Sequence, residues 1–207
     1  MRTHRLASHT AQEMRRLSNL GHVVEGTLLA AVGLLALLAT LGSAEWPNTV
    51  YAGLMVAAGV VLLIALYPRH PVSDWGTIWS DPQQREHTIM AAAVGLAGVA
   101  ELLARGRSPF GFAWPAALAL IGTLFLTHAQ HGTGEAMGRA VRRHRWIGAT
   151  AMAAGVLRLL SVIQIQLGGV SGRWWPIAVL AVATQLLLYR EPEGAFEAPD
   201  TSRHKAH

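Results

Sequence analysis

Cysteine is absent from the 207-residue sequence, and charged residues make up only 14% of it. The absence of cysteine excludes disulfide bonds, thiolate zinc sites, iron–sulfur clusters and cysteine nucleophiles. Soluble domains carry about 25% charged residues. The low charge, together with 52% hydrophobic residues, therefore indicates a protein embedded in lipid.

The sequence also lacks the short motifs of common catalytic classes. It has no Gly-x-x-x-x-Gly-Lys-Ser/Thr phosphate loop, no His-Glu-x-x-His pair and no Gly-x-Ser-x-Gly elbow. The net charge of +5 comes from arginines that flank apolar runs, so membrane topology explains it better than nucleic-acid binding does. The sequence thus assigns no enzymatic activity and predicts no nucleic-acid partner.

Six apolar runs each approach the ~20 residues that cross a bilayer core. They are Val23–Leu41, Val50–Tyr67, His87–Ala104, Phe112–Ala129, Arg145–Leu167 and Trp174–Tyr189. We therefore expect an all-α integral membrane bundle of six transmembrane helices within residues 23–190. Residues 1–22 are expected to form an amphipathic or flexible N-terminal segment, and residues 191–207 a flexible tail.

Lys and Arg are unequally shared between the two sides of this topology. The side with only three holds Arg105, Arg107 and Arg173. The side that carries both termini holds thirteen, which are Arg2, Arg5, Arg15, Arg16, Arg69, Arg85, Arg139, Arg142, Arg143, Arg145, Arg190, Arg203 and Lys205. Loops rich in Lys and Arg stay in the cytoplasm. The bias predicts a multi-pass inner (plasma) membrane protein with both termini cytoplasmic (N-in/C-in). Its partners are the lipid bilayer and, as open alternatives, other membrane proteins or a second copy of the chain.

Histidines and carboxylates gather near the predicted cytoplasmic helix ends. They are His22, Glu25, His87, His128, His131, Glu135 and His144. Positions 128, 131 and 135 share one face of a helix. Ionisable groups at membrane depth usually face the bundle interior and a partner, so we interpret this set as a ligand site. The alternative interpretation is that the histidines face headgroups or donate to backbone carbonyls.

Imidazole and carboxylate groups without thiolate suit copper, zinc or non-haem iron. For a bare ion we select His128, His131 and His144, with Glu135 or Glu25 as the fourth or supporting group. For haem b we select His87 and His128, because a short loop makes their two helices neighbours. Both alternatives stay open at this point.

A second polar pair lies deeper in the predicted bundle. Glu101 follows His87 by fourteen residues, and Arg158 follows His144 by fourteen residues. At 1.5 Å per residue, both lie about 21 Å from the cytoplasmic helix starts. Unpaired charges at this depth are costly, so we predict an intramembrane ion pair between Glu101 and Arg158. Its role is either structural or a polar step in a proton or ion path.

A basic turn precedes the segment Arg143-His144-Arg145-Trp146-Ile147-Gly148, which opens a run rich in Gly and Ala. Over about Leu124–Leu160 this pattern resembles the membrane domains of the copper resistance protein D family. The resemblance implies copper handling by a helical bundle with histidine ligands at His128, His131 and His144.

The first functional hypothesis is therefore a non-enzymatic membrane protein that binds a transition metal through its histidines, in copper homeostasis. The second is a membrane cytochrome that holds b-type haem and passes electrons to or from quinone. The third is an accessory structural subunit of a larger membrane complex. A haem absorption band would support the second hypothesis, and bound metal without such a band would support the first.

Overall fold

The computed structural model describes residues 11–42, 46–66, 75–104, 109–127, 134–163 and 171–194. These residues form helices and turns and contain no strand. The six long helices are α1 (Ala11–Leu41), α2 (Trp46–Leu66), α4 (Pro82–Ala104), α5 (Ala113–Thr127), α6 (Gly134–Val162) and α7 (Ser171–Leu188). Two short elements accompany them, α3 (Trp75–Ser80) and the 3₁₀ turn η3 (Pro109–Phe112). The prediction of an all-α fold is confirmed.

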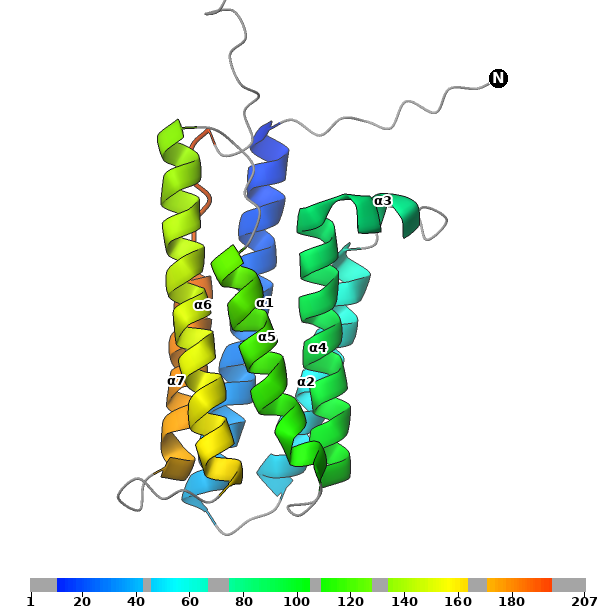
Figure 1. Ribbon diagram of the computed structural model, residues 1–207, viewed down its shortest axis with the longest axis vertical. Coiled ribbons are helices and arrows are strands. Elements are labelled where there is room, and N and C mark those ends of the chain that lie inside the picture. Colours follow the sequence, from blue (N-terminus) through cyan, green and yellow to red (C-terminus); the bar gives the residue numbers. More distant parts are fainter. Residues whose placement is uncertain are drawn as a thin grey trace, which may run out of the picture.

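The long helices run alternately up and down and form a closed ring (Figure 1). Each packs against its neighbour along the chain, and α7 returns to pack against α1. The starts of α1, α4 and α6 therefore lie at the same end of the bundle as the ends of α2, α5 and α7. This end is at the top of Figure 1.

Four segments are long and apolar enough to cross a membrane: residues 12–41, 46–64, 84–104 and 110–127. They belong to α1, α2, α4 and to η3 with α5. Helix α7 is apolar but shorter. Helix α6 carries four arginines in its first half (Arg139, Arg142, Arg143 and Arg145), which lower its hydropathy. Length and composition thus support a membrane protein. Among the described residues they identify four candidate spans, whereas six were predicted.

Glycines bring neighbouring helices into backbone contact. A Cβ atom at Gly59 of α2 would lie 2.6 Å from the Cα atom of Gly95 of α4. A Cβ atom at Gly122 of α5 would lie 2.9 Å from the carbonyl oxygen of Gly148 of α6. Only glycine allows such close approach. The small residues of α4 and α6 therefore pack these helices against α2 and α5.

Two helix starts differ from the sequence-based boundaries. Helix α1 begins at Ala11 and continues without a break through residue 22, and the residues of its first two turns, Ala11 to Leu17, are good helix formers. Helix α6 begins at Gly134 although the fifth apolar run starts at Arg145. Its first turn is opened by Gly134 with a φ of 61° and supported by the Glu135–Arg139 pair.

Candidate functional site: a histidine cluster beside an apolar cavity

His22 of α1 and His144 of α6 meet inside the upper end of the ring. Both side chains are buried, with 6% and 2% exposure, and their ring centroids lie 5.8 Å apart. Nδ1 of His22 donates to the carbonyl oxygen of Ser18 (2.8 Å), and Nδ1 of His144 to that of Ala140 (2.9 Å). A carbonyl oxygen only accepts, so Nδ1 of each ring carries the proton.

An aromatic residue beyond the end of α7 joins the two imidazoles. The ring of Tyr189 lies 4.3 Å from that of His22 and 4.9 Å from that of His144, between centroids. Phe125 of α5 approaches His144 at 5.7 Å. The two histidines therefore sit in an aromatic enclosure built by α1, α5, α6 and the residues after α7.

The chain after α7 is fastened to α1 by hydrogen bonds. Glu191 is buried and accepts hydrogen bonds from the hydroxyl groups of Ser18 (2.9 Å) and Tyr189 (3.0 Å). Its backbone N–H donates to Oδ1 of Asn19 (2.8 Å). The predicted flexible tail began at residue 191, but this first residue is part of the packed end of the bundle.

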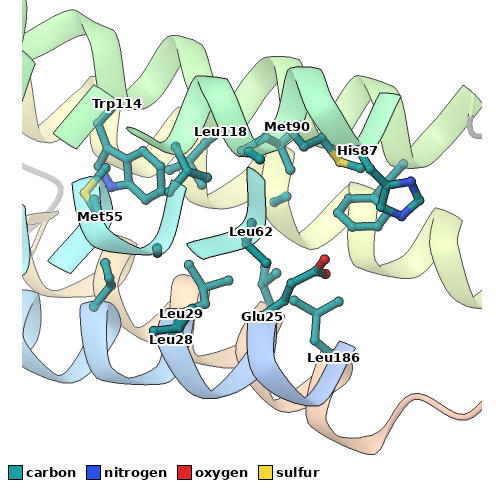
Figure 2. Close-up of a pocket in the computed structure, with 18 residues that line it drawn as sticks. Glu25, Leu28, Leu29, Met55, Leu62, His87, Met90, Trp114, Leu118 and Leu186 are labelled. Carbon is teal, nitrogen blue, oxygen red and sulfur yellow. The ribbon is translucent and has the colours of Figure 1, made fainter. Parts of the chain in front are cut away.

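His87 borders a cavity inside the ring (Figure 2). The cavity has a volume of about 80 Å³, and all six long helices contribute to its walls. These walls are almost entirely aliphatic and aromatic. His87 and Glu25 lie at one end of the cavity, and Trp114 lies at the other.

Glu25 brings a carboxyl group into this apolar space. Its side chain points into the cavity from α1, among Leu62, Leu186 and His87 (Figure 2). An ionised carboxyl group between apolar side chains is costly unless it is paired or hydrogen-bonded, and such groups mark candidate functional sites in membrane proteins. Glu25, which the sequence nominated as a supporting ligand, is therefore part of the cavity end that His87 borders.

The bare-ion ligand set expected from the sequence is only partly visible. His128 and His131 lie outside the described residues. Glu135 was nominated as a ligand, but its side chain is 93% exposed and pairs with Arg139 at 3.3 Å on the outside of α6. The next residue, Ala136, is buried, so the exposure of Glu135 comes from the side of α6 on which it lies. Within the described ranges, no group of three His, Asp or Glu residues could hold a metal ion.

A second buried polar cluster occupies the opposite end of the ring. Nη2 of Arg158 donates to both carboxylate oxygens of Glu101, at 2.9 and 3.0 Å. The hydroxyl group of Tyr51 donates to the same carboxylate at 2.6 Å, and the guanidinium carbon lies 4.7 Å from the Trp175 ring. The sequence nominated Glu101 and Arg158 but missed Tyr51 and Trp175. Tyr51 and Trp175 lie near the starts of α2 and α7. This position in the sequence indicated that they lie at a depth similar to that of Glu101 and Arg158.

Comparison of the chain with protein-family models, with curated proteins and with solved structures found no match. The functional argument therefore rests on the residues and geometry of this chain.

Proposed function

We propose that this chain is a membrane cytochrome that holds b-type haem inside its helix ring and exchanges electrons with membrane quinone. It crosses the inner (plasma) membrane six times and has both termini in the cytoplasm. The excess of Lys and Arg in the loops at the histidine-bearing end supports this orientation. The alternating directions of the six long helices are consistent with it (Figure 1).

The position of His87 is the observation that carries the proposal. Its imidazole borders an apolar cavity walled by all six long helices (Figure 2). Haem is a large apolar macrocycle whose iron takes axial ligands such as imidazole nitrogen. The cavity has an imidazole at its end. Its volume of about 80 Å³ is smaller than the roughly 300–1,000 Å³ of pockets that hold such ligands, so the surrounding helices must separate for haem to enter.

His22 and His144 are the candidates for a second axial ligand. The backbone carbonyl that holds each Nδ1 fixes the tautomer and the ring orientation, as outer partners do for ligating histidines. Both rings lie near the starts of α1 and α6, at the same end of the bundle as His87 near the start of α4. Because His128 lies outside the described residues, the proposal rests on His87 together with this buried pair.

A bare transition-metal ion is the second candidate, and the separation of His22 and His144 favours it. Two imidazoles bound to one ion at about 2.0–2.1 Å have ring centres roughly 5–6 Å apart, and these centroids lie 5.8 Å apart. Such a site fits the resemblance to the copper resistance protein D family. Protein sites for a bare ion supply three or four ligands, however, whereas haem requires only one or two. The described residues therefore support haem better.

Absorption spectroscopy and elemental analysis of one purified full-length sample test the proposal. We expect a Soret band with about one iron per chain, and loss of that band in His87→Ala. Glu135→Ala is the matched control, because this exposed carboxylate contacts no part of the cavity and the band should be retained. Copper or zinc without a Soret band would show that the site holds a bare ion and not haem. Absence of both would leave the accessory-subunit hypothesis.

A further inference from the structure

The residues that follow α7 return across the end of the bundle. Helix α7 ends at Leu188, and Tyr189 and Glu191 are buried although they belong to no helix. Nη1 of Arg143 on α6 donates to the carbonyl oxygen of Arg190. Helices α1 and α6 therefore hold this short segment between them, on top of the histidine pair.

The ring of Tyr189 contacts both imidazoles at once. It lies at a tilt of 31° to His22 and at 68° to His144, so one ring is packed nearly face to face and the other edge to face. Aromatic pairs at these separations attract each other in defined orientations. A ring held by its Nδ1 hydrogen bond on one side and by Tyr189 on another has little freedom to rotate.

Glu191 determines where Tyr189 lies. Its carboxylate accepts one hydrogen bond from Tyr189 and one from Ser18 on α1. Its backbone N–H donates to the side chain of Asn19. Hydrogen bonds to a carboxylate are roughly twice as strong as hydrogen bonds between neutral groups, and the Glu191 side chain is buried. The phenol ring is thereby tied to the helix that carries His22.

We infer that Tyr189 is a positioning residue for His22 and His144, and that Glu191 fastens it to α1. The segment Tyr189–Glu191 closes the histidine end of the ring and keeps each Nε2 in a single orientation. The consequence for a bound haem or metal rests on the proposed function. The closure itself stands on contacts among described residues.

Histidine acylation by diethyl pyrocarbonate tests the closure on the full-length protein in detergent. Peptide mass spectrometry gives separate rates for His22 and His144. We expect both to react about tenfold faster in Tyr189→Leu, because local opening governs access to buried groups. Tyr189→Phe keeps the ring and should stay within about twofold of the wild type. Trp146→Leu is the control, since it removes an exposed aromatic ring two residues from His144.

If His22 and His144 each react at the same rate in Tyr189→Leu as in the wild type, the inference is overturned. If Tyr189→Leu does not fold, the double variant Ser18→Ala/Glu191→Leu removes the side-chain hydrogen bonds of Glu191 to Tyr189 and Ser18 with little change in volume at residue 191. It should accelerate acylation about threefold, and unchanged rates would be equally decisive against the closure.

A spectroscopic measurement links the closure to the proposed function. In the haem-loaded protein, Tyr189→Leu should broaden or shift the ferric low-spin signals, and Tyr189→Phe should restore them. A protein without haem or metal would refute the proposed function, while the acylation rates would still decide on the closure. A loaded protein with unchanged signals and unchanged acylation in Tyr189→Leu would refute the positioning role alone.

Discussion

The two ends of the helix ring both bury polar side chains, but they do so in different ways. At the ion-pair end (Tyr51, Glu101, Arg158 and Trp175), a positive charge meets a negative charge with hydrogen bonds of 2.6–3.0 Å. At the histidine end (His22, His87, His144 and Tyr189), three rings pack against one another and His87 borders an apolar cavity. The first cluster joins two opposite charges, and the second is built from aromatic rings beside an apolar space.

From this difference we propose a structural role for the ion-pair end and a binding role for the histidine end. Glu101 is 6% and Arg158 17% exposed at the side chain, and a carboxylate that already accepts from Tyr51 and Arg158 has little capacity left for a ligand. At the histidine end, the Nδ1 hydrogen bonds to backbone carbonyls fix the tautomer and the orientation of the imidazoles. We therefore expect changes at the ion-pair end to alter stability, and changes at the histidine end to alter cofactor content.

The largest effect is expected from Glu101→Leu. It leaves the buried guanidinium of Arg158 without its carboxylate, which costs about 3–5 kcal/mol of unfolding free energy. The double variant Glu101→Leu/Arg158→Leu removes both charges and should cost less than the single change. Unfolding of detergent-solubilised protein by denaturant measures both values. Additive losses would show that the two residues are not coupled.

Tyr51→Phe should have the next largest effect. It removes the 2.6 Å hydrogen bond to the Glu101 carboxylate, and hydrogen bonds to charged groups contribute about 1.5–3 kcal/mol. The loss should disappear when the same change is made in the Glu101→Leu background, since the acceptor is then gone. An equal loss in both backgrounds would assign the effect to packing of the ring.

Gly98→Ala tests the helix contact that supports the ion-pair end. Its Cβ atom would lie 2.7 Å from the backbone nitrogen of Val56 and 2.8 Å from the carbonyl oxygen of Ala52. Helix α4 must then move away from α2, at a cost of about 1–3 kcal/mol. Gly53→Ala on α2 is the control, because no atom lies within 4 Å of that Cβ position. Thermal unfolding of the two variants should differ in sign or in size.

His22→Phe should have the smallest effect on stability. Phenylalanine keeps an aromatic ring against Tyr189 and loses only the hydrogen bond to Ser18, which contributes about 1 kcal/mol. The same variant should lower haem or metal content, measured on the sample used for unfolding. A variant that loses stability but keeps its cofactor would reverse the assignment of roles to the two ends.

Some features of the site were accessible from residue positions alone. Glu101 and Arg158 were matched because both lie fourteen residues into helices that start at the same side, and rise per residue converts this count into depth. The direction in which a side chain points around its helix axis is harder to predict from the sequence. Glu135 shares a helical spacing with His131, yet it points away from the bundle, since the direction it faces depends on which neighbours α6 packs against.

The return of the chain after α7 was not predictable from pattern. Tyr189 ends the sixth apolar run, and Glu191 begins the polar sequence that was expected to form a tail. Their burial depends on hydrogen bonds to Ser18 and Asn19, more than 170 residues earlier in the chain. Contacts over such separations have no local sequence signature, because they form only when α1 and α7 lie side by side.

The amino-acid sequence by itself determined that the protein is helical, apolar and compatible with a membrane, because hydropathy and helix length are local properties. It also determined the depth of each polar residue along its helix. Only the tertiary structure decided that α7 closes the ring onto α1, that His22 and His144 face each other, and that a cavity adjoins His87. The physical reason is that glycine contacts and buried hydrogen bonds between helices set their order and rotation, and these act between segments far apart in the chain.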